Sequence, residues 1–110
     1  MNARKKLFTF IETPLFTASW NKFASADELF KVMDELLGNP DAGDVIAGSG
    51  GLRKLRCGAN SKGKKGGARV IYFSKAADGK IYLLLSYPKS SLDDLTTDQK
   101  KALSSLVSKL

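Results

Sequence analysis

The sequence predicts an α+β domain, in which helices cover one face of a mainly antiparallel sheet. Three observations lead to this class: two helical segments near the N-terminus, a group of strand-like segments after them, and a tight-turn signal between two of those strands. The chain of 110 residues fits a single domain, spanning 1–110. We therefore expect a four-stranded sheet in the element order β-α-α-β-β-β-α, with the second face of the sheet left for function.

The first elements are indicated by strand-forming residues followed by helix-start signals. A strand is expected over Lys6–Ile11, and Thr13-Pro14 then caps and opens a helix. Ser25 and Glu28 form a capping box at the start of a second helix, whose apolar residues recur at helical spacing. The glycine-containing segment Asn39–Gly51 follows, and no regular structure is expected there.

The remaining elements are three strands and a helix. Leu52–Cys57 alternates in its pattern, and both Ala68–Phe73 and Lys80–Tyr87 are rich in β-branched and aromatic residues. Asp78-Gly79 is a favoured turn pair, so the last two strands are expected to form a hairpin. A capping box that begins at Thr96 starts the C-terminal helix, whose apolar stripe fits packing on the sheet or against a partner.

Positive charge is concentrated in one part of the chain. The formal net charge is +7, and the segment 45–77 contains eight bases and no acid. These bases are Arg53, Lys54, Arg56, Lys62, Lys64, Lys65, Arg69 and Lys75. Such a segment favours a polyanionic partner, because cations that neutralise phosphates release condensed counterions. A solubilising loop is the alternative for the lysine run, but the cations on the flanking strands favour nucleic acid.

The composition also excludes several kinds of chemistry. One cysteine, Cys57, and no histidine leave no internal disulfide framework, zinc finger or imidazole base. A reducing cytoplasm is the expected compartment, and neither a signal peptide nor a membrane span is indicated. The acids show no metal-ligand grouping, so no metal or other cofactor is expected. Gly58, Gly63 and Lys64 have P-loop spacing, but Lys65 stands where that motif needs Ser or Thr.

Three strand cations are candidates for RNA cleavage without a metal. Alternation along Leu52–Cys57 places Lys54 and Arg56 on one face and Arg53 on the other. Together with Arg69 on the next strand, they form a cluster that can stabilise a pentacoordinate phosphate and ease loss of the 2′-hydroxyl proton. The cations expected to bind the RNA backbone are Arg53, Lys62, Lys64 and Lys65.

Three short segments carry a resemblance to a known family. They are Gly43-Asp44-Val45-Ile46, Gly50-Gly51-Leu52-Arg53-Lys54-Leu55-Arg56 and Gly63-Lys64-Lys65-Gly66-Gly67-Ala68-Arg69-Val70-Ile71-Tyr72-Phe73. These segments resemble the HigB branch of the RelE-like toxins. The resemblance implies a RelE-like fold and a ribosome-dependent mRNA endonuclease that promotes 2′-hydroxyl attack without metal and inhibits translation. It also implies the 70S ribosome with mRNA and a HigA-like antitoxin of helix-turn-helix character as partners.

The resemblance also assigns roles to residues. Two alternating basic residues of the family's second strand fall on Lys54 and Arg56, and the arginine that opens its next strand falls on Arg69. The arginine and tyrosine that RelE carries after its last strand have no match here. Lys89 is the candidate to replace that cation in RNA binding, and Tyr87 is a candidate for base stacking or proton transfer. The general acid and general base stay unassigned.

Two other functions are compatible with the sequence. ParE-like relatives share the fold but bind a protein target such as DNA gyrase, so the fold alone does not decide the activity. A basic RNA-binding module is the second alternative. The cluster of Lys54, Arg56 and Arg69 is the feature that favours the endonuclease.

Overall fold

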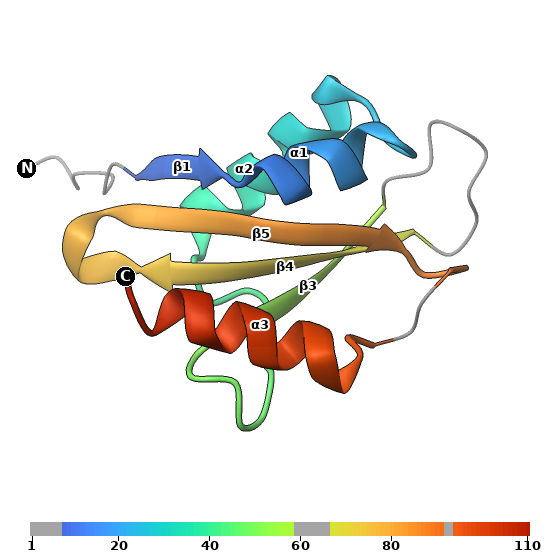
Figure 1. Cartoon of the computed structure of the whole chain (residues 1–110). Coiled ribbons are helices and arrows are strands. Elements are labelled where there is room, and N and C mark those ends of the chain that lie inside the picture. The colour runs from blue at the N-terminus through green and yellow to red at the C-terminus, as the bar shows by residue number, and fades with distance from the viewer. Residues whose placement is uncertain (1–7, 59–66, 92–93) are drawn as a thin grey trace, which may run out of the picture.

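The computed structural model describes residues 8–58, 67–91 and 94–110, and shows a sheet with helices on both faces (Figure 1). The elements are β1 (Thr9–Glu12), α1 (Pro14–Asn21), α2 (Ala26–Gly38), β2 (Asp44–Val45), β3 (Arg53–Cys57), β4 (Ala68–Lys75), a 3-10 turn (Ala76–Asp78), β5 (Lys80–Pro88) and α3 (Thr97–Val107). The strand order is β1-β5-β4-β3-β2, with β1 parallel to β5 and the other pairs antiparallel. The predicted α+β class is confirmed.

The sheet has five strands among the described residues, where four were predicted. The additional strand, β2, lies in the segment 39–51 that was expected to be irregular, and it pairs with β3 through Asp44 opposite Lys54 and Val45 opposite Arg53. A strand of two residues is too short to show alternation, so only its partner defines it. The predicted start of the first strand, at Lys6, lies outside the described residues.

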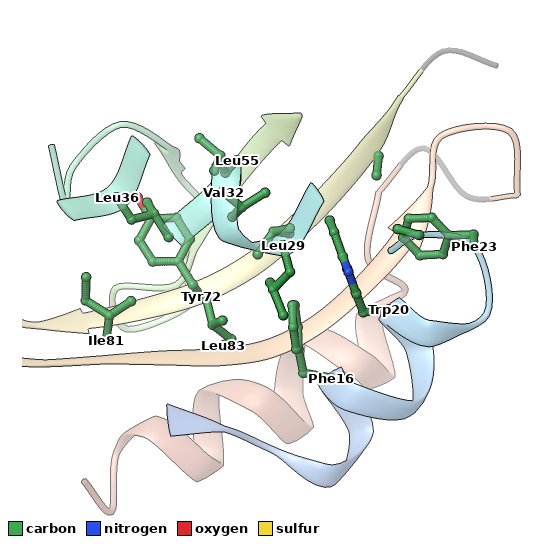
Figure 2. Close-up of a cluster of buried hydrophobic side chains, with 13 residues drawn as sticks. Phe16, Trp20, Phe23, Leu29, Val32, Leu36, Leu55, Tyr72, Ile81 and Leu83 are labelled. Carbon is green, nitrogen blue, oxygen red and sulfur yellow. The ribbon is translucent and has the colours of Figure 1, made fainter. Parts of the chain in front are cut away.

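The helices α1 and α2 pack on one face of the sheet through an aromatic cluster (Figure 2). Thr13 caps α1 and the Ser25 capping box starts α2, as predicted. Phe16 and Trp20 stack with 5.8 Å between ring centroids, and Trp20 Nε1 donates to the Ser25 carbonyl at 2.9 Å. The sheet residues buried in this cluster are Leu55, Ala68, Val70, Tyr72, Ile81 and Leu83.

The helix α3 covers part of the opposite face of the sheet (Figure 1). Its predicted capping box, Thr96 with Gln99, is present, and its Leu103 and Val107 are buried. They pack in one cluster with the sheet residues Leu52, Ile71, Leu84, Leu85 and Tyr87. The apolar stripe of α3 therefore packs on the sheet in this structure. The helix covers only part of this second face of the sheet, and Arg56 on the same face stays exposed.

A bulge in β5 decides which of its side chains lie on the α3 face. Leu84 is the extra residue, because Leu83 and Leu85 pair with consecutive residues of β4. If side chains alternated regularly along β5, Tyr87 would lie on the same face as Leu83, under α1 and α2. The bulge reverses the alternation, and Tyr87 lies in the cluster with α3 instead.

Replacing Gly67 by alanine is expected to destabilise the β3–β4 pair. Gly67 has a φ of +71°, and an added Cβ would overlap the carbonyl oxygen of Cys57. Gly50 is a matched control, since its φ is +75° and a Cβ there meets nothing within 4 Å. We expect Gly67→Ala to lower the free energy of unfolding by at least about 1 kcal/mol more than Gly50→Ala, measured by urea denaturation. Equal losses for the two variants would contradict the overlap.

The phenol of Tyr72 ties the segment before β2 to the sheet. Its hydroxyl donates to the Pro40 carbonyl at 2.7 Å and accepts from the Gly43 N–H at 2.9 Å. Burial raises the pKa of Tyr72, so its contribution to stability is present below its ordinary pKa and is lost as pH rises through the folded value.

We expect Tyr72→Phe to lower the free energy of unfolding by about 1–3 kcal/mol at neutral pH, because two buried backbone groups lose their partner. The variant also loses the part of the alkaline destabilisation that depends on this phenol. Urea denaturation from neutral to strongly alkaline pH measures both effects. Tyr82→Phe, at a half-buried ring that lies tilted against Phe73, is the control and stays within about 0.5 kcal/mol of the parent.

Candidate functional site

The register of the sheet aligns three candidate side chains across β3, β4 and β5. Arg56 lies directly opposite Arg69, and Arg69 lies directly opposite Tyr87. Lys54 lies two residues before Arg56 on the same face of β3. The residues that alternate with them are buried under α1 and α2, so all four side chains belong to the face that α3 partly covers. The structure therefore brings Lys54, Arg56 and Arg69 together, and we call these three the basic cluster.

The basic cluster is unfavourable for the sheet that carries it. Like charges directly opposite on neighbouring strands repel each other, as Arg56 and Arg69 must. Arg69 is only 8% exposed, and its Nη1 donates to the Ala68 carbonyl at 3.1 Å. Within residues 8–58, 67–91 and 94–110, no carboxylate forms an ion pair with it. Arrangements that cost stability in this way are typical of functional positions.

A carboxylate that the sequence did not assign to the site lies against the basic cluster. Asp94 Oδ1 is 2.5 Å from Lys54 Nζ, and the two residues are 40 positions apart in the chain. The hydrogen bond and charge of Lys54 lower the pKa of Asp94, and Arg69 and Arg56 lower it further. The place of Asp94 in the stretch after the last strand, where the arginine and tyrosine of RelE have no match, was the available signal.

A hollow of about 360 Å³ opens beside this ion pair. Its walls are Asp44 to Ala47, Lys54 and Arg56 of β3, and Asp94, Leu95 and Lys100 at the start of α3. Ile46 and Leu95 also pack against the apolar cluster under α3, so the hollow has an apolar floor and a charged rim. Three cations and two carboxylates line it, which suits a ligand with both an apolar part and an anionic group.

The predicted RNA-binding cations lie in different places. Arg53 is on the opposite face, where its Nη1 donates to the carbonyls of Gly43 at 2.7 Å and Asp41 at 3.2 Å, and Nη2 is 3.5 Å from the Asp41 carboxylate. These contacts hold the segment before β2. Lys89 is exposed directly after β5, and its backbone N–H donates to Gly67. Lys62, Lys64 and Lys65 lie outside the described residues.

Other features of the described chain add no further chemistry to the site. In the described ranges, no three Asp, Glu or Cys side chains are grouped as metal ligands would be. None of the helices described in the structure has the length and apolar character needed to span a membrane. Cys57 is half-buried at the end of β3 and packs against the α1–α2 cluster, in agreement with a structural thiol.

No protein-family model matches the chain. The structure is similar to a mutant of the E. coli toxin RelE in the free state, with a TM-score of 0.62 and 12% identity over 92% of this chain and 97% of that one. The chain has a RelE-like fold. The intact E. coli RelBE toxin–antitoxin complex matches this RelE-like chain with a TM-score of 0.56 and 16% identity, over 74% of it and 95% of the other chain.

The ion pair between Lys54 and Asp94 predicts a measurable titration. Because the pKa of Asp94 is lowered in the folded protein, the stability it contributes is present above the ordinary carboxyl pKa and is lost as pH falls through the folded value. We expect Lys54→Ala to raise the pKa of Asp94 towards its ordinary value, as measured by NMR of the side-chain carboxyl carbon. Lys100→Ala removes a cation from the same hollow and is the control, with a small effect. An unchanged Asp94 titration in Lys54→Ala would refute the ion pair.

Proposed function

We propose that this RelE-like protein is the toxin of a type II toxin–antitoxin system and cleaves mRNA. The observation that carries the proposal is the direct opposition of Arg56 and Arg69 on neighbouring strands, with Lys54 and Tyr87 beside them. Two opposed arginines repel each other in the free sheet, and an anion between them, with its negative charge shared by two oxygens, turns that repulsion into attraction. The phosphodiester of an RNA backbone is such an anion.

The proposed reaction is attack of a ribose 2′-oxygen on the adjacent phosphorus. The O2′–P bond forms as the P–O5′ bond breaks, which leaves a 2′,3′-cyclic phosphate and a 5′-hydroxyl. One proton leaves the 2′-oxygen, and one is delivered to the departing 5′-oxygen. Arg56 and Arg69 stabilise the charge that develops on the pentacoordinate phosphate, and Lys54 adds a third positive charge. Tyr87, in the same row of the sheet, is a candidate for proton transfer or for stacking on a base.

The proposed partners follow from the fold and the charge. The similarity to the RelBE toxin–antitoxin complex supports a cognate antitoxin. The glycine-rich basic segments favour the HigB branch, and therefore a HigA-like antitoxin with helix-turn-helix character. The net charge of +7 supports binding to mRNA and the ribosome. Because the proposed activity acts on mRNA at translating ribosomes, we propose that it takes place in the cytoplasm. Lys89 and the lysines at 62, 64 and 65 are proposed to bind the RNA backbone outside the reacting phosphate.

The decisive experiment induces the protein in cells and maps new mRNA 5′ ends. We expect Arg56→Ala to reduce codon-linked cleavage by about 100-fold or more, because one donor to the transition state is removed. Arg56→Lys keeps the charge but loses the forked donors, so it is expected to retain an intermediate activity. Arg56 is exposed, which makes both variants compatible with folding. Arg69→Lys tests the buried partner, with its folding checked by circular dichroism.

The control is Lys22→Ala, which removes one exposed positive charge at the end of α1, in the layer behind the sheet. It should cleave as the parent does. Cleavage that survives Arg56→Ala and Arg69→Lys would remove the site assignment. Arrest of replication without any new mRNA ends would favour a ParE-like protein that binds gyrase.

A further inference from the structure

We propose that the hollow between β2, β3 and the start of α3 binds one nucleotide of the RNA, and that the Asp94 carboxylate occupies the position of its phosphate in the free protein. The proposal rests on the function proposed above, since it names a subsite for that substrate. The subsite predicts RNA binding, whereas the proposed function predicts RNA cleavage. The two predictions can be tested separately, because RNA can bind in the hollow whether or not it is cut.

The group that faces Lys54 in the free protein has the same charge pattern as a phosphodiester. A carboxylate and a phosphodiester each carry one negative charge shared by two equivalent oxygens, so both accept from an ammonium group in the same way. Asp94 presents this group at 2.5 Å from Lys54 Nζ. The Asp94 side chain is 74% exposed, whereas that of Lys54 is 21% exposed. The acceptor is therefore the member of the pair that can leave, and the cation stays in place for an incoming anion.

The electrostatic field at the same point also favours an anion. Lys54, Arg69 and Arg56 all act to favour the charged form of Asp94, so the carboxylate lies where the fields of the three proposed catalytic cations overlap. An ion pair whose carboxylate is largely exposed contributes little to stability, because solvent screens it. Exchange of this carboxylate for a phosphate of equal charge therefore costs little, and it relieves the opposition of the two arginines more fully if the phosphate reaches both.

The size and lining of the hollow suit a nucleotide. Its volume of about 360 Å³ falls in the range of small-ligand sites, roughly 300–1,000 Å³. Ile46 and Leu95 provide apolar surface suited to a base, and Lys54 lies at the rim where the phosphate attached to that base would be. Lys100, on α3, adds a cation at the other side. The combination of an apolar floor and a cationic rim fits a nucleotide better than a free anion.

The test measures binding separately from cleavage. The probes are a short single-stranded RNA with 2′-O-methyl groups, which cannot be cut by 2′-oxygen attack, and inorganic phosphate. We expect Asp94→Asn to bind the methylated RNA about threefold to fivefold more tightly at low salt, because the competing carboxylate is removed. The slope of log K against log salt concentration should also become steeper, since one more cation is left to neutralise phosphate.

The matched control is Asp41→Asn. Asp41 also pairs with a β3 cation, Arg53, and has a similarly exposed side chain, 72%, but it lies on the other face of the sheet. It loses the same charge, so a general effect of net charge on RNA affinity should appear in both variants, and the proposed local effect only in Asp94→Asn. Thermal unfolding of each variant confirms that the fold is kept.

A second variant separates the base from the phosphate. Ala47 is exposed and lines the hollow, so Ala47→Leu fills it without changing charge or the buried core. We expect this variant to weaken binding of the methylated RNA and to leave binding of inorganic phosphate unchanged. Equal effects on both probes, or none on the RNA, would overturn the nucleotide subsite and leave at most an anion site.

The outcomes also separate this subsite from the proposed activity. Unchanged or weaker RNA binding by Asp94→Asn would overturn the role of its carboxylate as the stand-in for phosphate, even if the parent protein cleaves mRNA. Tighter binding by Asp94→Asn, together with a parent protein that produces no mRNA ends, would keep the subsite and remove the endonuclease.

Discussion

Pairing of β3 with β4 in a fixed register sets Arg56 opposite Arg69, and most of the fold serves to hold that register. Between the charged rows, Leu55 and Val70 pair on the opposite face and are buried under α1 and α2. A slip of β3 by one residue would turn its Lys54 and Arg56 into this core and its Leu55 out of it. The aromatic layer around Trp20 therefore does more than stabilise the sheet, because it keeps two repelling cations on one face.

The two faces of the sheet have different roles. The face under α1 and α2 stabilises the fold, and the other face carries the candidate site. Under α1 and α2, apolar side chains fill the interior and the Tyr72 hydroxyl has two backbone partners. On the other face, α3 covers only the part near Leu103 and Val107, and a hollow remains between its start and β2. Arg53 and Tyr72 secure the segment that precedes β2, so a rigid support carries the wall of that hollow.

The free protein also carries a counterion for its own cations. Asp94 reaches Lys54 from the turn before α3, and its carboxylate lies in the field of both arginines. Such a contact places a negative charge beside the like charges of the basic cluster, which repel each other. It also links substrate binding to the start of α3, since a phosphate and this carboxylate cannot occupy one position.

The sequence alone determined the features that depend on a few neighbouring residues. Caps at Thr13, Ser25 and Thr96 were predicted because side chain and backbone meet within three residues, and period-two alternation separated Lys54 and Arg56 from Arg53. Tertiary structure alone decided the strand β2, the bulge that turns Tyr87 towards α3, and the contact of Asp94 with Lys54. Each of these features depends on contacts between segments that are separated in the chain. A local sequence pattern carries no information about the energy of such contacts.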